Sequence, residues 1–184
     1  MSITVRVILT IATCIAGTML SGFQSKETRR PSKVYSVCEV LADLASFNGK
    51  MISVRGAVLG GQGTFLVGNC QSKLVVKGFT WPNLIWLTFP YKSSTPFNAD
   101  LATYQHVMDA VKRMHPGKND QIVLTYLGVL ESDDLAKRTS LNRMGQPTGI
   151  GFGAQNMAPA QLVIKTVMDP QVIPSGRDGP VRGN

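Results

Sequence analysis

The feature that most constrains this chain is the placement of its three cysteines relative to an uncharged N-terminal run. Cys14 lies inside that run, which extends from Val7 to about Leu20 behind the basic residue Arg6. A basic residue before a short apolar segment is typical of a secretory signal peptide, since a bilayer-spanning helix needs about 20 apolar residues. We therefore expect residues 1–22 to be a signal peptide and the protein to be exported, to the periplasm or as a secreted protein.

Two alternatives to a cleaved signal peptide stay open. The small residues between Ala16 and Gly22 offer no clean cleavage site, and an uncleaved segment would anchor the protein in the membrane. Cys14 would carry lipid in a lipoprotein, although Thr13 stands where such a motif has Gly or Ala. No other uncharged run in the sequence is long enough to span a bilayer, so membrane contact is expected only through a retained N-terminal segment.

After the predicted signal peptide, Cys38 and Cys70 are the remaining cysteines. In an oxidising compartment an even pair is most simply a structural disulfide. Such a bridge would close a loop of about 33 residues and stabilise the fold by about 3–4 kcal/mol in the chain-entropy description. A redox-active pair is the alternative, but the C-x-x-C spacing that usually lowers a thiol pKa is absent.

The remainder of the chain divides into a tether, a domain and a tail. Residues 23–34 are polar and aperiodic, which predicts a flexible tether, and residues 171–184 have the composition of a disordered tail. Residues 35–170 have the length of one domain with its own core. Residues 36–170 carry twelve Lys and Arg against nine Asp and Glu, a net charge of +3 out of +8. Most of the excess charge therefore lies outside the domain, which disfavours nucleic acid as a partner.

Local patterns predict two helices. Ser36 and Glu39 have the spacing of a capping box and begin a helix that Asn48 and Gly49 end. Its apolar stripe has helical spacing and consists of Val37, Val40, Leu41 and Leu44. A second helix is predicted over residues 98–115, with an apolar stripe of Leu101, Tyr104, Met108 and Val111.

Five stretches have the alternation or the β-branched content of strands, namely 51–58, 64–68, 73–77 with 84–87, 121–131 and 161–168. Pro82 interrupts the third stretch, whose second piece either continues the strand after a bulge or forms a separate edge. The second helix falls between the third and fourth stretches, which is the order of an OB-type barrel. We therefore expect a mainly β fold with two helices, an OB-like five-stranded Greek-key barrel with an N-terminal helix added. Gly56 and Gly128 stand where coiled barrel strands often kink.

No pattern in the sequence marks a catalytic residue, a metal site or a cofactor site. The run from Gly149 to Ala154 has the spacing of a dinucleotide-binding loop, but no strand precedes it and no helix follows. We interpret this run as a turn-rich loop. His106 and His115 have no cysteines at metal-ligand spacing, and the adjacent pair Asp133-Asp134 is typical of a solvated loop.

A binding surface is the remaining functional hypothesis. OB barrels commonly bind ligands on the face of the second and third strands and on the adjoining loops. Basic residues around an aromatic side chain would suit a polyanion or single-stranded nucleic acid on that face. The candidate residues are Arg55, Phe65, Lys73, Lys77, Lys137, Arg138 and Arg143. An ordinary polar barrel exterior is the alternative for each of them.

Several short groups of residues form a distinctive set along the domain. They are Val37-Cys38-Glu39-Val40-Leu41, Asn48-Gly49-Lys50 before Val54-Arg55-Gly56, Trp81-Pro82, and Gly151-Phe152-Gly153 before Pro159-Ala160-Gln161-Leu162-Val163-Ile164. Together they resemble a family of small, uncharacterised exported bacterial proteins. The resemblance covers most of residues 35–168 and implies a shared exported domain with a bridging cysteine pair. It implies no activity and no catalytic residues.

These observations favour a non-enzymatic domain that binds an undetermined ligand or protein partner at the cell envelope. An anionic ligand or an envelope protein is the expected class of partner. The alternative is an exported hydrolase or transferase that uses the 132–159 loop, which a cluster of nucleophile, base and oxyanion donor would support. A third hypothesis is a purely structural interaction module, which an exposed apolar patch would support.

Overall fold

The computed structural model describes residues 33–60, 63–90, 97–132, 134–153 and 156–174. The predicted signal peptide lies outside the described residues, as do most of the predicted tether and residues 175–184 of the tail.

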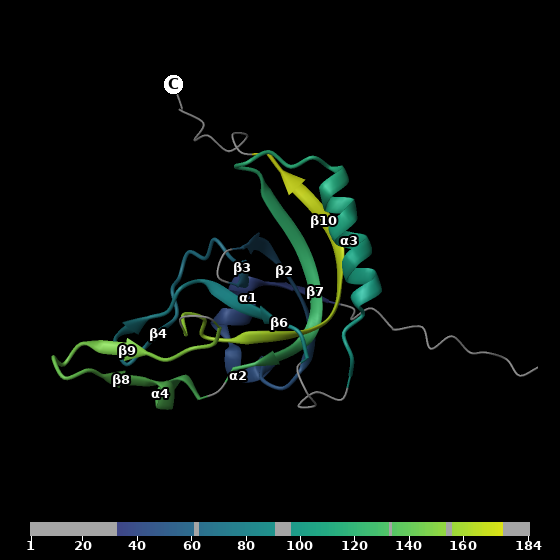
Figure 1. The fold of residues 1–184 in the computed structure, drawn as a ribbon. Helices are drawn as coiled ribbons and strands as arrows, with labels where there is room; N and C mark the ends of the chain where they lie inside the picture. Colours follow the sequence, from purple (N-terminus) through teal and green to yellow (C-terminus); the bar gives the residue numbers. More distant parts are fainter. Residues whose placement is uncertain (1–32, 61–62, 91–96, 133, 154–155, 175–184) are drawn as a thin grey trace, which may run out of the picture. The chain divides into compact units, whose positions relative to one another are not determined.

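Five strands close a barrel, with β2 (Met51–Leu59) beside β3 (Thr64–Val67), then β6 (Leu84–Thr88), β10 (Gln161–Ile173) and β7 (Gln121–Glu131). Strand β7 pairs back onto β2 and closes the circle (Figure 1). Strands β6 and β10 run parallel, and the other four barrel pairings are antiparallel. Helix α3 (Leu101–Arg113) lies between β6 and β7 in the chain. This order and these directions confirm the predicted OB-like Greek-key barrel.

Helix α1 (Val37–Ala42) packs its apolar face into the core of the barrel. Val37, Val40 and Leu41 are at most 4% exposed and belong to the same core cluster as the barrel strands. Gly56 permits this approach, because a Cβ at that position would lie 2.8 Å from Val37 Cγ2. The structure thus confirms the buried stripe of α1. It also gives a reason for the glycine at position 56, one of the two glycines that were expected at kinks in the strands.

The capping box at the start of α1 is also confirmed. The Glu39 amide donates to Ser36 Oγ at 3.2 Å, and the Ser36 amide donates to Glu39 Oε2 at 2.7 Å. The Ser36 amide, and then the Ser36 hydroxyl that donates to Glu39 Oε2 at 3.0 Å, hold the pKa of Glu39 below its usual value. The prediction of one helix up to Asn48 is wrong, since Asp43 ends α1 and accepts from the Ser46 amide to begin α2 (Leu44–Phe47). With α4 described below, the described residues form four helices rather than two.

Helix α3 lies along β10 on one side of the barrel (Figure 1). It begins later than predicted because Asp100 caps it, accepting from the Thr103 amide at 3.0 Å and from its hydroxyl at 2.6 Å. The hydroxyl bond and then the amide bond lower the pKa of Asp100. Val107 and Val111 are buried, whereas Leu101 is 62% exposed, so its assignment to the apolar stripe is wrong.

The third predicted strand divides into two separate pieces. Only β4 (Val75–Val76) forms within residues 73–77, and it pairs with β5 (Phe79–Thr80) outside the barrel. The turn between them has positive φ at Lys77 and Gly78, which lets the chain reverse direction within two residues. The piece after Pro82 becomes β6, the third strand of the barrel.

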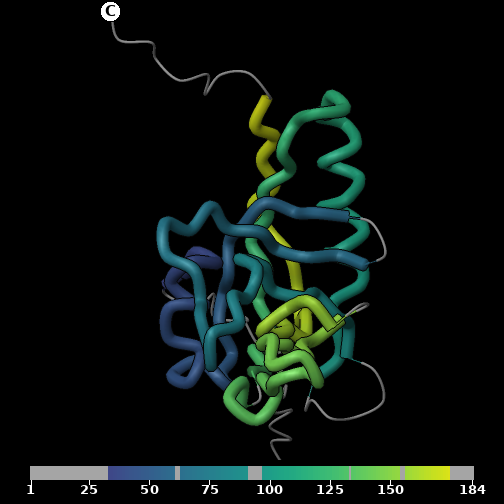
Figure 2. Tube along the Cα trace, turned by 90° about the vertical axis from the view of Figure 1, so that its left-hand side faces the viewer, coloured from purple at the N-terminus to yellow at the C-terminus, as the bar shows by residue number. Residues whose placement is uncertain are grey.

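The predicted 132–159 loop contains regular structure. Helix α4 (Leu135–Arg138) leads into β8 (Thr139–Leu141), which pairs with β9 (Pro147–Gly149) as an antiparallel hairpin. We call the described residues 134–150 the arm. Figure 1 shows the arm reaching away from the barrel on the side opposite α3, and Figure 2 shows it from its end.

Both ends of the domain extend beyond the predicted limits. Strand β1 (Val34–Ser36) pairs parallel with β2, so the predicted tether stops at residue 33. Strand β10 continues to Ile173 past Pro170, because a register shift between Met168 and Gln171 removes the proline from the ladder. Residues 171–173, which were predicted to belong to the disordered tail, are therefore part of the sheet. Gly128 pairs with Ile164 at the other register shift of β10, between Ile164 and Thr166. A Cβ at Gly128 would collide with the Val163 carbonyl.

The predicted disulfide between Cys38 and Cys70 is confirmed, with a Cα–Cα distance of 5.3 Å. It joins α1 to the segment that follows β3. The bond therefore ties a helix that enters the core to the body of the barrel.

We expect reduction of this bond to lower the melting temperature, because the unfolded chain regains the entropy of a loop of about 33 residues, about 3–4 kcal/mol. Cys38→Ser should give the same loss and should make the melt insensitive to added reductant. Thermal unfolding followed by circular dichroism measures both effects. An unchanged melting temperature in both tests would contradict a stabilising role for the bridge.

Candidate functional site

Arg55 is bound to neighbours on the outer side of β2, β7 and β10. Its guanidinium donates to Thr125 Oγ1 at 2.9 Å, to the Asp169 carbonyl at 3.1 Å and to Gln171 Oε1 at 2.8 Å. These bonds hold the irregular end of β10 against β2 and β7. Arg55 therefore has a structural set of partners, and the structure does not bring it to the arm.

Three of the predicted basic residues do lie together, around α4. Lys77 Nζ donates to the carbonyls of Ala136 at 2.6 Å and Thr139 at 3.3 Å, which ties the β4–β5 turn to the arm. Lys137 pairs with Asp134 at 3.5 Å. The Arg138 guanidinium lies 4.5 Å from the centre of the Phe152 ring.

The other predicted residues are dispersed. Phe65 contacts Trp86 edge to face across β3 and β6, with ring centres 4.9 Å apart. Arg143 is exposed between β8 and β9, and Lys73 lies near the disulfide. The seven residues expected to bind an anionic ligand therefore do not form one surface.

The glycine run from Gly149, the last residue of β9, to Gly153 packs against the two tryptophans. A Cβ at Gly149 or Gly151 would lie 2.5 or 2.7 Å from the Trp81 indole, and one at Gly153 would lie 2.5 Å from Trp86. Gly149 and Gly151 alternate along the chain and so present the same side to Trp81, whereas Gly153, with a φ of +83°, approaches Trp86. Trp81 is fully buried as a result.

This contact explains the spacing that resembles a dinucleotide-binding loop. The glycines are required by the indoles that they cover. The expectation that no strand precedes the run is wrong, because Gly149 is the last residue of β9. The contact also places part of the chain itself over Trp86, on the strands where OB barrels commonly bind ligands.

We expect Gly151→Ala to loosen this part of the fold, because the added methyl group meets both Trp81 and the Ala158 carbonyl. Overpacking of this kind typically costs about 1–3 kcal/mol. Gly60→Ala is the matched control, since nothing lies within 4 Å of its Cβ position. Chemical denaturation followed by tryptophan fluorescence should show the loss for Gly151→Ala alone, and equal stability of the two variants would refute the packing role.

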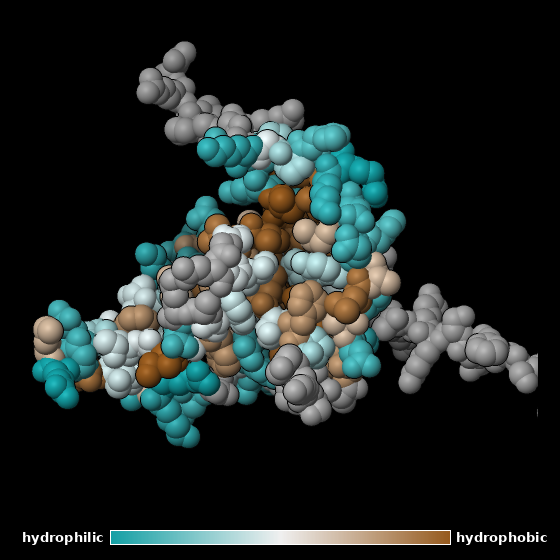
Figure 3. All heavy atoms as spheres, in the orientation of Figure 1, coloured by the Kyte–Doolittle hydropathy of each residue, from teal (hydrophilic) through white to brown (hydrophobic). Residues whose placement is uncertain are grey.

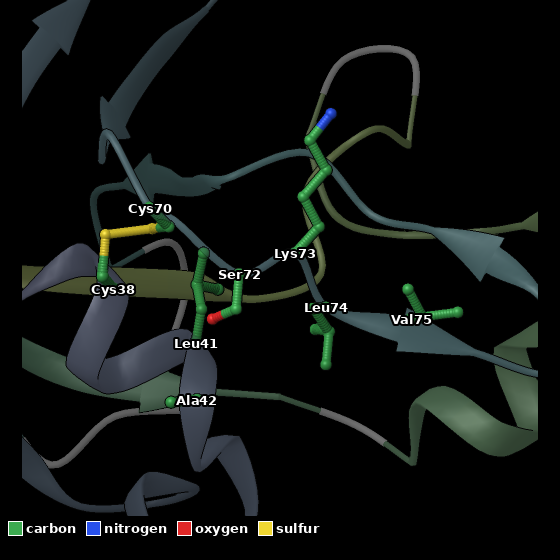
Figure 4. A pocket seen from close by; sticks show the side chains of 8 residues that line it. All are labelled: Cys38, Leu41, Ala42, Cys70, Ser72, Lys73, Leu74 and Val75. Carbon is green, nitrogen blue, oxygen red and sulfur yellow. A yellow bond between two sulfur atoms is a disulfide. The ribbon is translucent and has the colours of Figure 1, made fainter.

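A described hollow lies between the N-terminal helices, the segment 72–76 and the base of the arm. It consists of two adjoining parts of about 240 and 610 Å³ that share Leu41, Ala42 and Leu74. We call this hollow the groove. Figure 4 shows its smaller part, with the disulfide at one side and Leu74 and Lys73 directed to opposite sides of their segment. The apolar lining is Leu41, Ala42, Leu44, Ala45, Leu74, Val75, Val76, Leu135 and Ala136.

The polar side chains of the larger part of the groove make hydrogen bonds within the chain. The Ser132 amide donates to Asn48 Oδ1 at 2.7 Å, and the Ser132 hydroxyl donates to the Leu44 carbonyl at 3.2 Å. Asp43 and Asp134 cap α2 and α4 and supply two carboxylates to the larger part. Lys73 supplies a positive charge to the smaller part. The groove therefore combines an apolar lining with a negative end and a positive end.

Sequence reasoning missed the groove because its residues were assigned to other roles. Leu41 was predicted as core, and Leu74 and Val76 were predicted as parts of a barrel strand. Their common surface depends on the Cys38–Cys70 bridge, which was predicted, and on the position of the base of the arm, which was not.

The described residues show no arrangement of catalytic groups around this groove. His106 and His115 belong to α3 and to the turn after it, across the barrel from the arm (Figure 1). Within the described ranges, no three His, Cys, Asp or Glu residues lie close enough to hold a metal ion. None of the helices in the described part of the chain has both the length and the apolar character needed to cross a bilayer.

Comparisons of the chain with known protein families, with curated proteins and with solved structures each found no match. The fold and the site by themselves define a class: a small disulfide-bonded β barrel of OB-like topology that carries an open apolar groove. The resemblance stated for the sequence stays a prediction.

Proposed function

We propose that this protein is an exported binding domain whose groove holds an apolar segment of a protein partner. The observation that carries the proposal is the apolar lining of a hollow of about 610 Å³ whose own polar groups are already bonded within the chain. Ligand sites have this character and this size, with a mostly apolar lining and few polar groups.

Rigid parts of the fold form the walls. One wall is α1 with α2, which continues the buried core through Leu41 and Leu44. The opposite wall is the segment that follows Cys70, and the disulfide fixes the two walls together. A preformed site loses little entropy when its partner binds, which favours recognition over accidental contact.

The charges in the groove indicate what the partner segment carries. Asp43 and Asp134 are both exposed carboxylates in the larger part, although the chain has a net charge of +8. A lysine or arginine beside the apolar residues of the partner would complement them. The disulfide agrees with an oxidising compartment, so the partner is expected at the cell envelope or outside the cell.

We test this with short synthetic peptides of leucine and valine that carry one flanking lysine, or one flanking glutamate in its place. Fluorescence polarisation should show binding of the lysine peptides to the oxidised protein. Ala42→Trp should abolish binding by filling the shared part of the groove, whereas Ala102→Trp, an exposed helical alanine on α3, should not.

The charge dependence is tested by Asp43→Asn with Asp134→Asn, because asparagine retains the helix cap and removes the charge. We expect the preference for lysine over glutamate to fall by up to about fivefold, since a peripheral ion pair contributes up to about 1 kcal/mol. Equal binding by the Ala42→Trp and Ala102→Trp variants would refute the groove as the site. An unaltered preference in the double Asn variant would refute its acidic end.

A further inference from the structure

The tip of the arm exposes two large apolar side chains. Leu141, at the end of β8, is 66% exposed, and Met144, in the turn to β9, is 82% exposed. In Figure 3 the arm reaches furthest to the side, and apolar patches interrupt its hydrophilic surface. These side chains lie at the end of a projection rather than scattered over the barrel.

The turn that carries them has a defined structure. Asn142 Oδ1 accepts from the amides of Met144 and Gln146, both at 2.9 Å. The Asn142 amide also donates to the Gln146 carbonyl at 2.9 Å, and Gly145 has a φ of +73° that the turn requires. Exposure of Leu141 and Met144 is therefore built into the hairpin, and neither side chain folds back onto the arm.

The charged residues of the arm are mostly positive, with Arg143 near the tip and the others at the base. Arg143 stands between the two apolar residues in sequence and is exposed. Lys137, at the base of the arm, has 86% of its side chain exposed, and its ion pair with Asp134 at 3.5 Å is correspondingly weak. Lys77 and Arg138 add two further positive charges beside α4. The arm thus has an apolar end with basic residues behind it.

We propose that the tip of the arm inserts into the interface of an anionic lipid bilayer. Leucine and methionine would enter the boundary between headgroups and acyl chains, while the basic side chains meet the phosphates. The tip is too small for a stable protein interface, which needs a far larger buried area on each partner. A bilayer accepts two side chains on a narrow projection, and its negative charge complements the arm.

This inference is independent of the groove and of the N-terminal segment. Membrane contact was expected only through residues 1–22, whereas the tip lies in the folded domain. The two proposals are compatible, because the groove lies at the base of the arm and the lipid contact at its end. Their tests use different variants, so either can fail alone.

The experiment places a fluorescent reporter at the tip of the full chain. Met144→Trp keeps an apolar side chain there, and its emission is obtained by subtracting the spectrum of the unmodified protein. We expect a blue shift with vesicles of phosphatidylglycerol and phosphatidylethanolamine, and a much smaller one with phosphatidylcholine alone. Leu101→Trp, at an equally exposed leucine on α3, is the control and should not shift.

Further variants in the Met144→Trp background separate the contribution of apolar insertion to lipid binding from that of the basic residues. Leu141→Asp should weaken the lipid affinity of the tip by about tenfold or more, since it removes one leucine that the bilayer would bury. Arg143→Gln should reduce the dependence on salt and on anionic lipid, whereas Lys118→Gln, after α3, should not.

Attachment through the N-terminal segment alone would leave the reporter at residue 144 unshifted, and that result would overturn the proposal. A shift of the same size with phosphatidylcholine would overturn the role of the basic residues. A shift caused only by an added protein partner, without vesicles, would show that the tip is a protein contact instead.

Discussion

The packing of α1 into the barrel, held by the Cys38–Cys70 disulfide, is the constraint on which the other features depend. Val37 and Val40 occupy the core, and Gly56 leaves the space that α1 needs. The bridge then fixes the segment after β3 beside the same helix. Because the barrel end is filled in this way, the surface next to α1 becomes a groove with two rigid walls.

The contacts outside the barrel serve the same arrangement. Lys77 ties the β4–β5 turn to α4 through two backbone carbonyls, which holds the base of the arm beside the groove. The glycines from Gly149 to Gly153 pack against Trp81 and Trp86 and secure the return of the chain from the arm to β10. Gly153 thus covers Trp86 on the strands where OB barrels commonly bind ligands, while the groove and the tip of the arm present apolar side chains to solvent.

Sequence reasoning succeeded where the information was local or repeated. The capping box of Ser36 and Glu39 located α1, the alternation of residues 121–131 located β7, and the order of elements gave the barrel topology. It failed where distant contacts decide the outcome. The arm depends on pairing of Thr139 with Gly149 across a turn without a strong hairpin signature, and the role of the glycine run depends on indoles far away in the sequence. The groove joins Leu41 to Leu74, which no local pattern connects.

Amide hydrogen exchange of the oxidised and the reduced protein tests most directly whether the bridge holds the groove together. We expect reduction to speed exchange in α1 and in residues 70–76, because without the cross-link these two segments can open separately from each other. Strands β7 and β10 should keep their protection, since their ladder does not involve the cysteines. If exchange in α1 stays unchanged on reduction, or rises equally throughout the barrel, the disulfide does not organise the groove and the central claim is wrong.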